Sequence, residues 1–170
     1  LIRSRGLGDV YKRQPLISAT GSTRMGRIVG STVAKRFGKS LLELGGNNAI
    51  IVTPNADLKI TVIGSLFGAV GTCGQRCTTT RRLIVHSSIY EDVKNKLFSA
   101  YEQIKIGNPL DESNHVGPLI DIDAVNAYLN AIKRAKEEGG EVIVEGGVIE
   151  GEGYESCLLY TSPSPRDLMR

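Results

Sequence analysis

The sequence predicts an α/β fold with mostly parallel sheets. Short apolar runs alternate along the chain with longer segments whose apolar residues recur at helical spacing, and glycine-containing turns separate them. This alternation is typical of parallel strands covered by helices. We expect strands at residues 15–20, 40–44, 48–52, 82–86 and 141–144. We expect helices at residues 22–37, 57–70, 88–104 and 121–138.

The first strand and helix form half of a βα nucleotide-binding unit. Residues 15–20 are a short apolar run, and the helix after it places its apolar residues at helical spacing, namely at Ile28, Val29, Val33 and Ala34. Gly45 and Gly46 then separate two further strands. The next helix is so rich in apolar residues that we expect it to be buried.

The later elements carry recognisable start and stop signals. A serine precedes the amphipathic residues of the helix expected at 88–104, so it predicts a serine cap, and residues 107–111 are typical of a turn. Gly139 and Gly140 stand where the last helix should end. Its apolar face is expected to consist of Ile122, Val125, Leu129, Ile132 and Ala135.

Two glycine-flanked motifs carry reactive side chains. Leu42-Glu43-Leu44-Gly45-Gly46 supplies a carboxylate, and Gly74-Gln75-Arg76-Cys77 supplies a thiol. A thiolate adds to a carbonyl to give a covalent intermediate, and a carboxylate can activate the water that releases it. Since backbone next to glycine can approach a ligand closely, we expect one shared active site.

With these motifs the sequence resembles an aldehyde dehydrogenase over residues 15–155. The resemblance rests on four ordered motifs, Gly21-Ser22-Thr23-Arg24-Met25-Gly26, Glu43-Leu44-Gly45-Gly46-Asn47-Asn48-Ala49, Gly74-Gln75-Arg76-Cys77 and Ile106-Gly107-Asn108-Pro109 followed by Gly117-Pro118. Within that superfamily the sequences of these motifs are most similar to those of the α-aminoadipic semialdehyde dehydrogenase group. The resemblance implies part of the aldehyde dehydrogenase fold: residues 15–46 would end an NAD-binding domain, and residues 47–155 would begin a catalytic domain.

The resemblance also implies roles for both reactive residues. Cys77 would attack the aldehyde to give a thiohemiacetal, which becomes a thioester once hydride passes to NAD or NADP. Glu43 would activate water for hydrolysis, and its presence favours a free acid product because relatives that transfer the acyl group to coenzyme A generally lack it. The alternatives are an inert buried cysteine and a surface glutamate; we expect Glu43, between two leucines, to be buried.

Three further residues are candidates for binding. Gly21 and Ser22 lie between a strand and a helix, where the helix dipole favours phosphate, although a Gly-Ser pair there is more often only a cap. The resemblance makes them candidate pyrophosphate contacts. Arg76 is a candidate partner for a substrate carboxylate, as in a dicarboxylic semialdehyde, with a structural ion pair as the alternative. The residue that would distinguish NAD from NADP lies upstream of residue 15.

The remaining cysteine and histidine residues do not form a metal-binding pattern. Cys73 precedes Cys77 by four residues without a second ligand pair, so we interpret it as a packing residue, with a resolving thiol as the alternative. His86 lies in an apolar strand and His115 in a turn, and we expect both to be structural.

The two ends of the chain are interpreted as translated adaptor DNA. Suitable codons for residues 157–167 have a reverse complement that encodes residues 4–14. We therefore leave residues 1–14 and 156–170 out of fold reasoning, natural disordered tails being the alternative. The rest holds 15 basic and 16 acidic residues, so the excess of 21 Lys and Arg over 18 Asp and Glu indicates neither nucleic-acid nor membrane binding.

The composition, 41% hydrophobic and 23% charged, suits a globular protein without a signal peptide or membrane span. The cysteines are too few for a disulfide framework, which favours a reducing compartment, the cytoplasm. By resemblance the whole protein would oxidise a small-molecule aldehyde as a homodimer or homotetramer. The 170-residue polypeptide, lacking other family motifs, is expected to be inactive. The alternatives are a non-catalytic relative with a structural or binding role and an aldehyde dehydrogenase of another subgroup.

Overall fold

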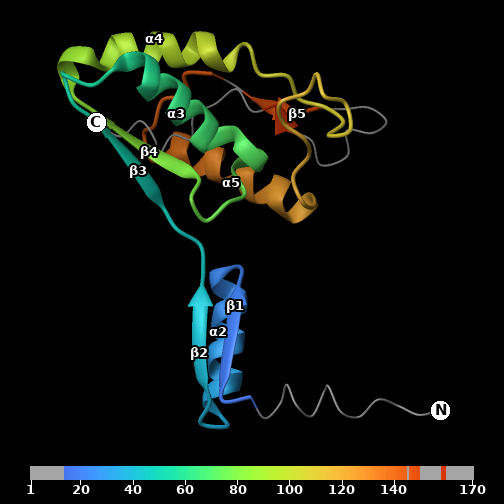
Figure 1. Cartoon of the computed structure of the whole chain (residues 1–170). Coiled ribbons are helices and arrows are strands. Elements are labelled where there is room, and N and C mark those ends of the chain that lie inside the picture. The colour runs from blue at the N-terminus through green and yellow to red at the C-terminus, as the bar shows by residue number, and fades with distance from the viewer. Residues whose placement is uncertain (1–13, 145, 150–157, 160–170) are drawn as a thin grey trace. The chain divides into compact units, whose positions relative to one another are not determined.

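The computed structural model describes residues 14–144, 146–149 and 158–159. The chain divides into two compact units, Leu1–Gly46 and Asn47–Arg170 (Figure 1). Except for residues 14 and 158–159, the two segments interpreted as adaptor lie outside the described residues.

The smaller unit is a β-α-β arrangement. Strand β1 (Leu16–Thr20) leads into helix α2 (Thr23–Ala34), and strand β2 (Lys39–Glu43) returns to pair in parallel with β1. The pairing runs from Leu16 opposite Lys39 to Thr20 opposite Glu43. The helix ends three residues before the expected position because Phe37 takes a left-handed backbone conformation, with φ 58°.

Helix α2 packs on β2 through a close backbone approach at Gly26. A Cβ atom on Gly26 would lie 2.6 Å from each terminal methyl carbon of Leu44, so only glycine leaves room for that leucine. Gly30, one turn further along the helix, has more space: its Cβ would lie 3.5 Å from the nearest Leu42 methyl carbon. The helix therefore fits the strand most tightly beside the end of β2.

The larger unit is built on a second parallel pair, β3 (Asn48–Val52) and β4 (Thr80–Val85), joined through helix α3 (Leu58–Val70). Helix α4 (Tyr90–Tyr101) and helix α5 (Ile122–Glu137) follow. Two short 3₁₀ helices, η1 (Gly71–Gly74) and η2 (Ser87–Ile89), precede β4 and α4. Strands β5 (Gly147–Val148) and β6 (Leu158–Leu159) form a small antiparallel pair (Figure 1).

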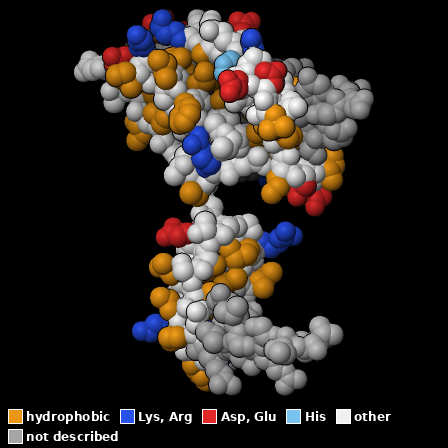
Figure 2. Space-filling view, turned by 45° about the vertical axis from the view of Figure 1, so that its right-hand side comes forward, with side chains coloured by type: hydrophobic (Ala, Val, Ile, Leu, Met, Phe, Trp, Pro, Cys, Tyr) orange, Lys and Arg blue, Asp and Glu red, His pale blue; other side chains and the backbone are white. Residues whose placement is uncertain are grey.

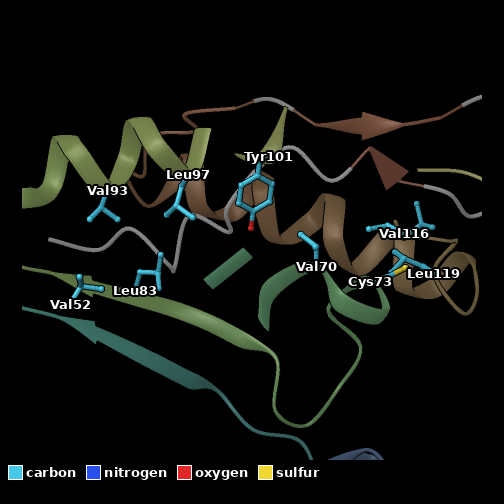
Figure 3. Close-up of a cluster of buried hydrophobic side chains, with 10 residues drawn as sticks. Val52, Val70, Cys73, Leu83, Val93, Leu97, Tyr101, Val116 and Leu119 are labelled. Carbon is cyan, nitrogen blue, oxygen red and sulfur yellow. The ribbon is translucent and has the colours of Figure 1, made fainter. Parts of the chain in front are cut away.

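The core of the larger unit lies between the β3–β4 pair and the helices. Figure 3 shows Val52 and Leu83 of the strands on one side and Val93, Leu97 and Tyr101 of α4 on the other. The same cluster includes Val70, Cys73, Val116, Leu119 and Val125. Burial of these side chains is the main stabilising contribution in this unit.

Two sequence predictions about element ends are wrong. The serine cap expected for the helix at 88–104 is absent: α4 starts after Ile89, which makes no side-chain cap, and the His86 side chain accepts the Ser88 N–H instead. Residues 141–144 form no strand, and the next strand, β5, begins at Gly147. The end at Gly139 is confirmed, since this residue has φ 86° and the Gly140 N–H donates to the Ala135 carbonyl.

The expected burial of α3 is correct for only one of its faces. Val62, Leu66 and Ala69 pack against the core, whereas the opposite face is exposed, with Ile60 70% and Phe67 66% accessible. On α5, Val125 is buried as expected, but Ile122 and Leu129 are exposed because Ala124 and Tyr128 pack on the core in their place.

Apolar side chains therefore contribute to the surface of both units, as Figure 2 shows. Among the described residues, every helix is too short or too polar to span a bilayer.

Candidate active site

Cys77 lies in an exposed turn between η1 and β4. The turn is closed twice, because the Thr79 N–H donates to the Arg76 carbonyl at 3.2 Å and the Arg76 N–H donates to the Thr79 hydroxyl oxygen at 3.0 Å. Thr79 is only 4% exposed, so it anchors the turn from beneath. The alternative of an inert buried cysteine is wrong for Cys77, whose position leaves its thiol accessible.

A side chain from the start of β3 also holds this turn. The Asn48 amide nitrogen Nδ2 donates to the Cys77 carbonyl at 2.7 Å and to the Thr79 carbonyl at 3.1 Å. Asn48 precedes Cys77 by 29 residues. In the sequence Asn48 is only part of a motif, and nothing local indicates this contact.

The segment just before the turn has an unusual backbone. Thr72, Cys73 and Gly74 take left-handed conformations with φ of 52°, 55° and 68°. Such conformations are rare for residues other than glycine, and rarest for a β-branched residue such as Thr72.

Two contacts join this segment to the loop at residues 117–120. The Cys73 thiol donates to the Gly117 carbonyl at 2.9 Å, and the Gln75 side-chain oxygen accepts the Ile120 N–H at 3.0 Å. Figure 3 shows Cys73 beside Val116 and Leu119. Cys73 is thus a buried packing residue, as predicted, and also a hydrogen-bond donor.

The Arg76 side chain is directed back onto α3. Its guanidinium carbon lies 5.1 Å from the centre of the Phe67 ring, and Nη2 donates to the Phe67 carbonyl at 3.3 Å. The guanidinium occupies the space that a Cβ on Gly71 would need. The described partners of Arg76 are an aromatic ring and a backbone carbonyl rather than a structural ion pair, and its pairing with a substrate carboxylate stays a prediction.

Glu43 is the last residue of β2, and its side chain is exposed. The expected burial between two leucines is wrong because successive side chains of a strand point to opposite faces. Leu42 and Leu44 turn toward α2, as their contacts with Gly30 and Gly26 show, so Glu43 faces away. Its carboxylate is accessible to water.

Gly21 and Ser22 lie beside Glu43 at the start of α2. The Gly21 N–H donates to the Glu43 carbonyl at 3.0 Å, and the Ser22 hydroxyl oxygen caps the helix by accepting the Met25 N–H at 3.1 Å. Among the described residues, the N–H groups of Thr23 and Arg24 have no acceptor. These two N–H groups and the Ser22 hydroxyl proton are therefore available to an anion.

The two histidines make local structural contacts. His86 Nδ1 lies 2.9 Å from the Ser88 hydroxyl, and His115 Nδ1 accepts the Lys105 N–H at 3.0 Å. Within the described ranges, no three His, Cys, Asp or Glu side chains are grouped so that they would hold a metal ion.

The chain is similar to known proteins over most of its length. The model of the aldehyde dehydrogenase family matches residues 11–166. The chain is 52% identical over 141 residues to aldehyde dehydrogenase family 7 member A1 of Pisum sativum, which covers 83% of this chain and 28% of that protein. It is 52% identical over 142 residues to α-aminoadipic semialdehyde dehydrogenase of Bos taurus, with 84% of this chain and 26% of that protein covered. The chain thus spans about a quarter of the length of these curated relatives.

Solved structures of aldehyde dehydrogenases are also similar to this chain. Lactaldehyde dehydrogenase from Escherichia coli superposes with a TM-score of 0.79 at 33% identity, covering 86% of this chain and 31% of that one. Betaine aldehyde dehydrogenase from Staphylococcus aureus in complex with NAD⁺ superposes with a TM-score of 0.78 at 30% identity, covering 88% and 31%. The expected fold class is confirmed by these structures.

Proposed function

The chain belongs to the aldehyde dehydrogenase family, and we propose that the whole protein oxidises an aldehyde to a carboxylic acid with NAD⁺ or NADP⁺. The observation that carries this proposal is the exposed thiol of Cys77, in a turn whose backbone is held from two sides. An accessible nucleophile on a fixed backbone is what covalent catalysis at a carbonyl requires.

Cys77 is the proposed nucleophile. Its thiolate sulfur attacks the carbonyl carbon of the aldehyde, and the carbonyl oxygen becomes the oxyanion of a thiohemiacetal. The Arg76 carbonyl points into the turn toward the Thr79 N–H. Because all described peptide bonds are trans, the Cys77 N–H of the same peptide points the opposite way. It has no acceptor among the described residues, so it can donate to the oxyanion.

The start of α2 is the proposed contact for the cofactor's pyrophosphate. Two N–H groups without acceptors, the Ser22 hydroxyl proton and the positive end of a helix dipole suit a phosphate chemically. Gly21 contributes by joining β1 to this helix without a side chain between them and the ligand. Bound NAD⁺ or NADP⁺ would supply the hydride acceptor that leaves a thioester on Cys77.

Glu43 is the proposed general base for the second half-reaction. Its carboxylate takes a proton from water, the water oxygen attacks the thioester carbon, and the Cys77 thiolate leaves. The products are the carboxylic acid, the regenerated thiolate and a protonated Glu43, which returns its proton to solvent before the next turnover, so atoms and charge balance. The exposure of Glu43 supports this role because water can reach the carboxylate.

The proposed substrate is a semialdehyde such as aminoadipic semialdehyde. Support comes from the relatives from Bos taurus and Rattus norvegicus, both of which are named for oxidising that compound. We also propose a cytoplasmic, homo-oligomeric protein, with residues 15–46 in the cofactor domain and residues 47–155 in the catalytic domain. The exposed thiol of Cys77 supports a reducing compartment.

The proposal is tested on the full-length protein by mixing it with aminoadipic semialdehyde and NAD⁺ or NADP⁺ and recording absorbance of the reduced cofactor. Cys77→Ala should remove both the initial burst and the steady rate. Glu43→Gln should keep a burst of about one equivalent per site and lower the steady rate at least 100-fold, because the thioester forms but is not hydrolysed. A steady rate that survives Cys77→Ala would exclude this mechanism.

A further inference from the structure

We propose that Asn48 is a positioning residue that fixes the backbone of Cys77 for attack on a carbonyl. This inference rests on the proposed function, because it assigns to Asn48 a part in the acylation of Cys77. Asn48 is not assumed to touch the substrate; it acts through the turn at residues 76–79.

Two peptide planes flank the Cα atom of Cys77, and a hydrogen bond holds each of them. The plane before it is held by the Thr79 N–H, which donates to the Arg76 carbonyl. The plane after it is held by the Asn48 amide, which donates to the Cys77 carbonyl at 2.7 Å. Since a peptide unit is planar, anchoring one carbonyl on each side fixes both soft backbone dihedral angles of Cys77.

The same amide makes a second contact, which joins two residues of the turn. Asn48 Nδ2 also donates to the Thr79 carbonyl at 3.1 Å, so one side chain joins the nucleophile to the residue that closes the turn. Thr79 is buried and the Cys77 side is exposed. The Asn48 amide therefore links the exposed Cys77 to Thr79, which is packed in the interior.

The pairing of β3 with β4 is irregular where it places Asn48 beside the turn. Asn48 lies opposite Thr80, but the next residue, Ala49, lies opposite Arg82, so Arg81 is passed over. Irregularities of this kind re-aim a side chain and are common beside active sites. The Asn47 carbonyl is tied to β4 by the Arg82 guanidinium at 2.5 Å, which holds the start of β3 in place.

The test uses Asn48→Leu in the full-length protein. Leucine is similar in size to asparagine and uncharged, and it lacks the amide that donates to the Cys77 and Thr79 carbonyls. Asn47→Leu is the matched control, because it makes the same change one residue earlier, where no side-chain hydrogen bond to a described residue is lost. Asn48→Ala is the second variant. Thermal unfolding and solubility are recorded for each, so that folding is known before rates are compared.

Two reagents separate positioning from general loss of reactivity. Acylation of Cys77 by p-nitrophenyl acetate needs the thiol and the backbone oxyanion donor together, whereas alkylation by iodoacetamide needs only the thiolate. We expect Asn48→Leu to slow acylation by about 10- to 100-fold and to change alkylation by less than about threefold. Asn47→Leu should leave both rates near the wild-type values.

Every outcome bears on the assignment. Equal acylation rates for the two leucine variants, or a parallel fall in acylation and alkylation, would overturn it. If neither Asn48 variant folds while Asn47→Leu does, Asn48 supports the fold and the positioning role is excluded. If the wild-type protein reduces no cofactor but Asn48→Leu still slows acylation, the proposed function alone is refuted. A wild-type protein that p-nitrophenyl acetate cannot acylate refutes both proposals.

Discussion

Cys77 and Glu43, the two residues with proposed chemical roles, are held in place in different ways. The Cys77 turn depends on side chains from distant parts of the chain, namely Asn48 and, through the preceding segment, the contacts to Gly117 and Ile120. Glu43 is held by the regular pairing of β2 with β1 and by the Gly21 N–H on its carbonyl. A nucleophile positioned by a few side chains should be sensitive to single polar substitutions, whereas a base on a strand should be sensitive to packing.

The largest loss of stability expected in this comparison comes from changing the packing beside Glu43. Gly26→Ala places a methyl group against both terminal carbons of Leu44, the residue next to Glu43. We expect it to cost about 1–3 kcal/mol through overpacking. The displaced strand end should slow thioester hydrolysis by about 10-fold. Thermal unfolding and the steady-state rate after the burst measure the two effects in the full-length protein.

Gly30→Ala is the matched control on the same helix. Its new methyl group would meet Leu42 at 3.5 Å, an ordinary contact, so helix propensity should stabilise the protein by about 0.5–1 kcal/mol. Equal stabilities for the two alanine variants would show that the tight approach at Gly26 does not matter and that Glu43 does not depend on this packing.

A smaller effect is expected from the hydroxyl that closes the Cys77 turn. Thr79→Val keeps the shape and removes the acceptor of the Arg76 N–H, at a cost of about 0.5–1.5 kcal/mol. Acylation by p-nitrophenyl acetate should slow by up to about 10-fold. Thr78→Val makes the same change at an exposed neighbour and should leave the rate unaltered. If both valine variants behave alike, Thr79 does not fix the turn.

The smallest effect is expected from Arg76→Ala. Because its guanidinium already lies on Phe67 and donates to that residue's carbonyl, we expect a loss of about 0.5–1 kcal/mol in stability. The ratio of KM values for an acidic semialdehyde and an uncharged aldehyde should stay the same. A selective rise of the KM for the acidic substrate by more than about 10-fold would instead assign Arg76 to substrate binding.

Much of the fold could be predicted because its signals are local. Asp57 and Asp121 cap α3 and α5 with their carboxylates, and Gly139 ends α5, each at a position that sequence patterns indicate. Local patterns failed where packing decides the outcome. The apolar residues of α3 are shared between a core face and an exposed face, and spacing alone does not tell which face has a partner.

The same distinction applies to the candidate site. The motifs placed Cys77 after α3 and Glu43 at the end of a strand, and the structure agrees with both positions. The contacts of Asn48 with Cys77 and of Arg76 with Phe67 could not be predicted. Their partners are apart in sequence by 29 and 9 residues, and no periodicity relates them.

The left-handed segment at Thr72 and Cys73 has a consequence for the order in which the protein matures. Thr72 and Cys73 take a left-handed conformation that costs about 1–2 kcal/mol for each residue. The conformation therefore persists only while the contacts with Gly117 and Ile120 hold it. Those partners follow by 44 and 45 residues. During synthesis the segment before Cys77 therefore leaves the ribosome well before the residues that hold its backbone, and only the contacts of Asn48 and Thr79 can order the Cys77 turn until Gly117 and Ile120 emerge.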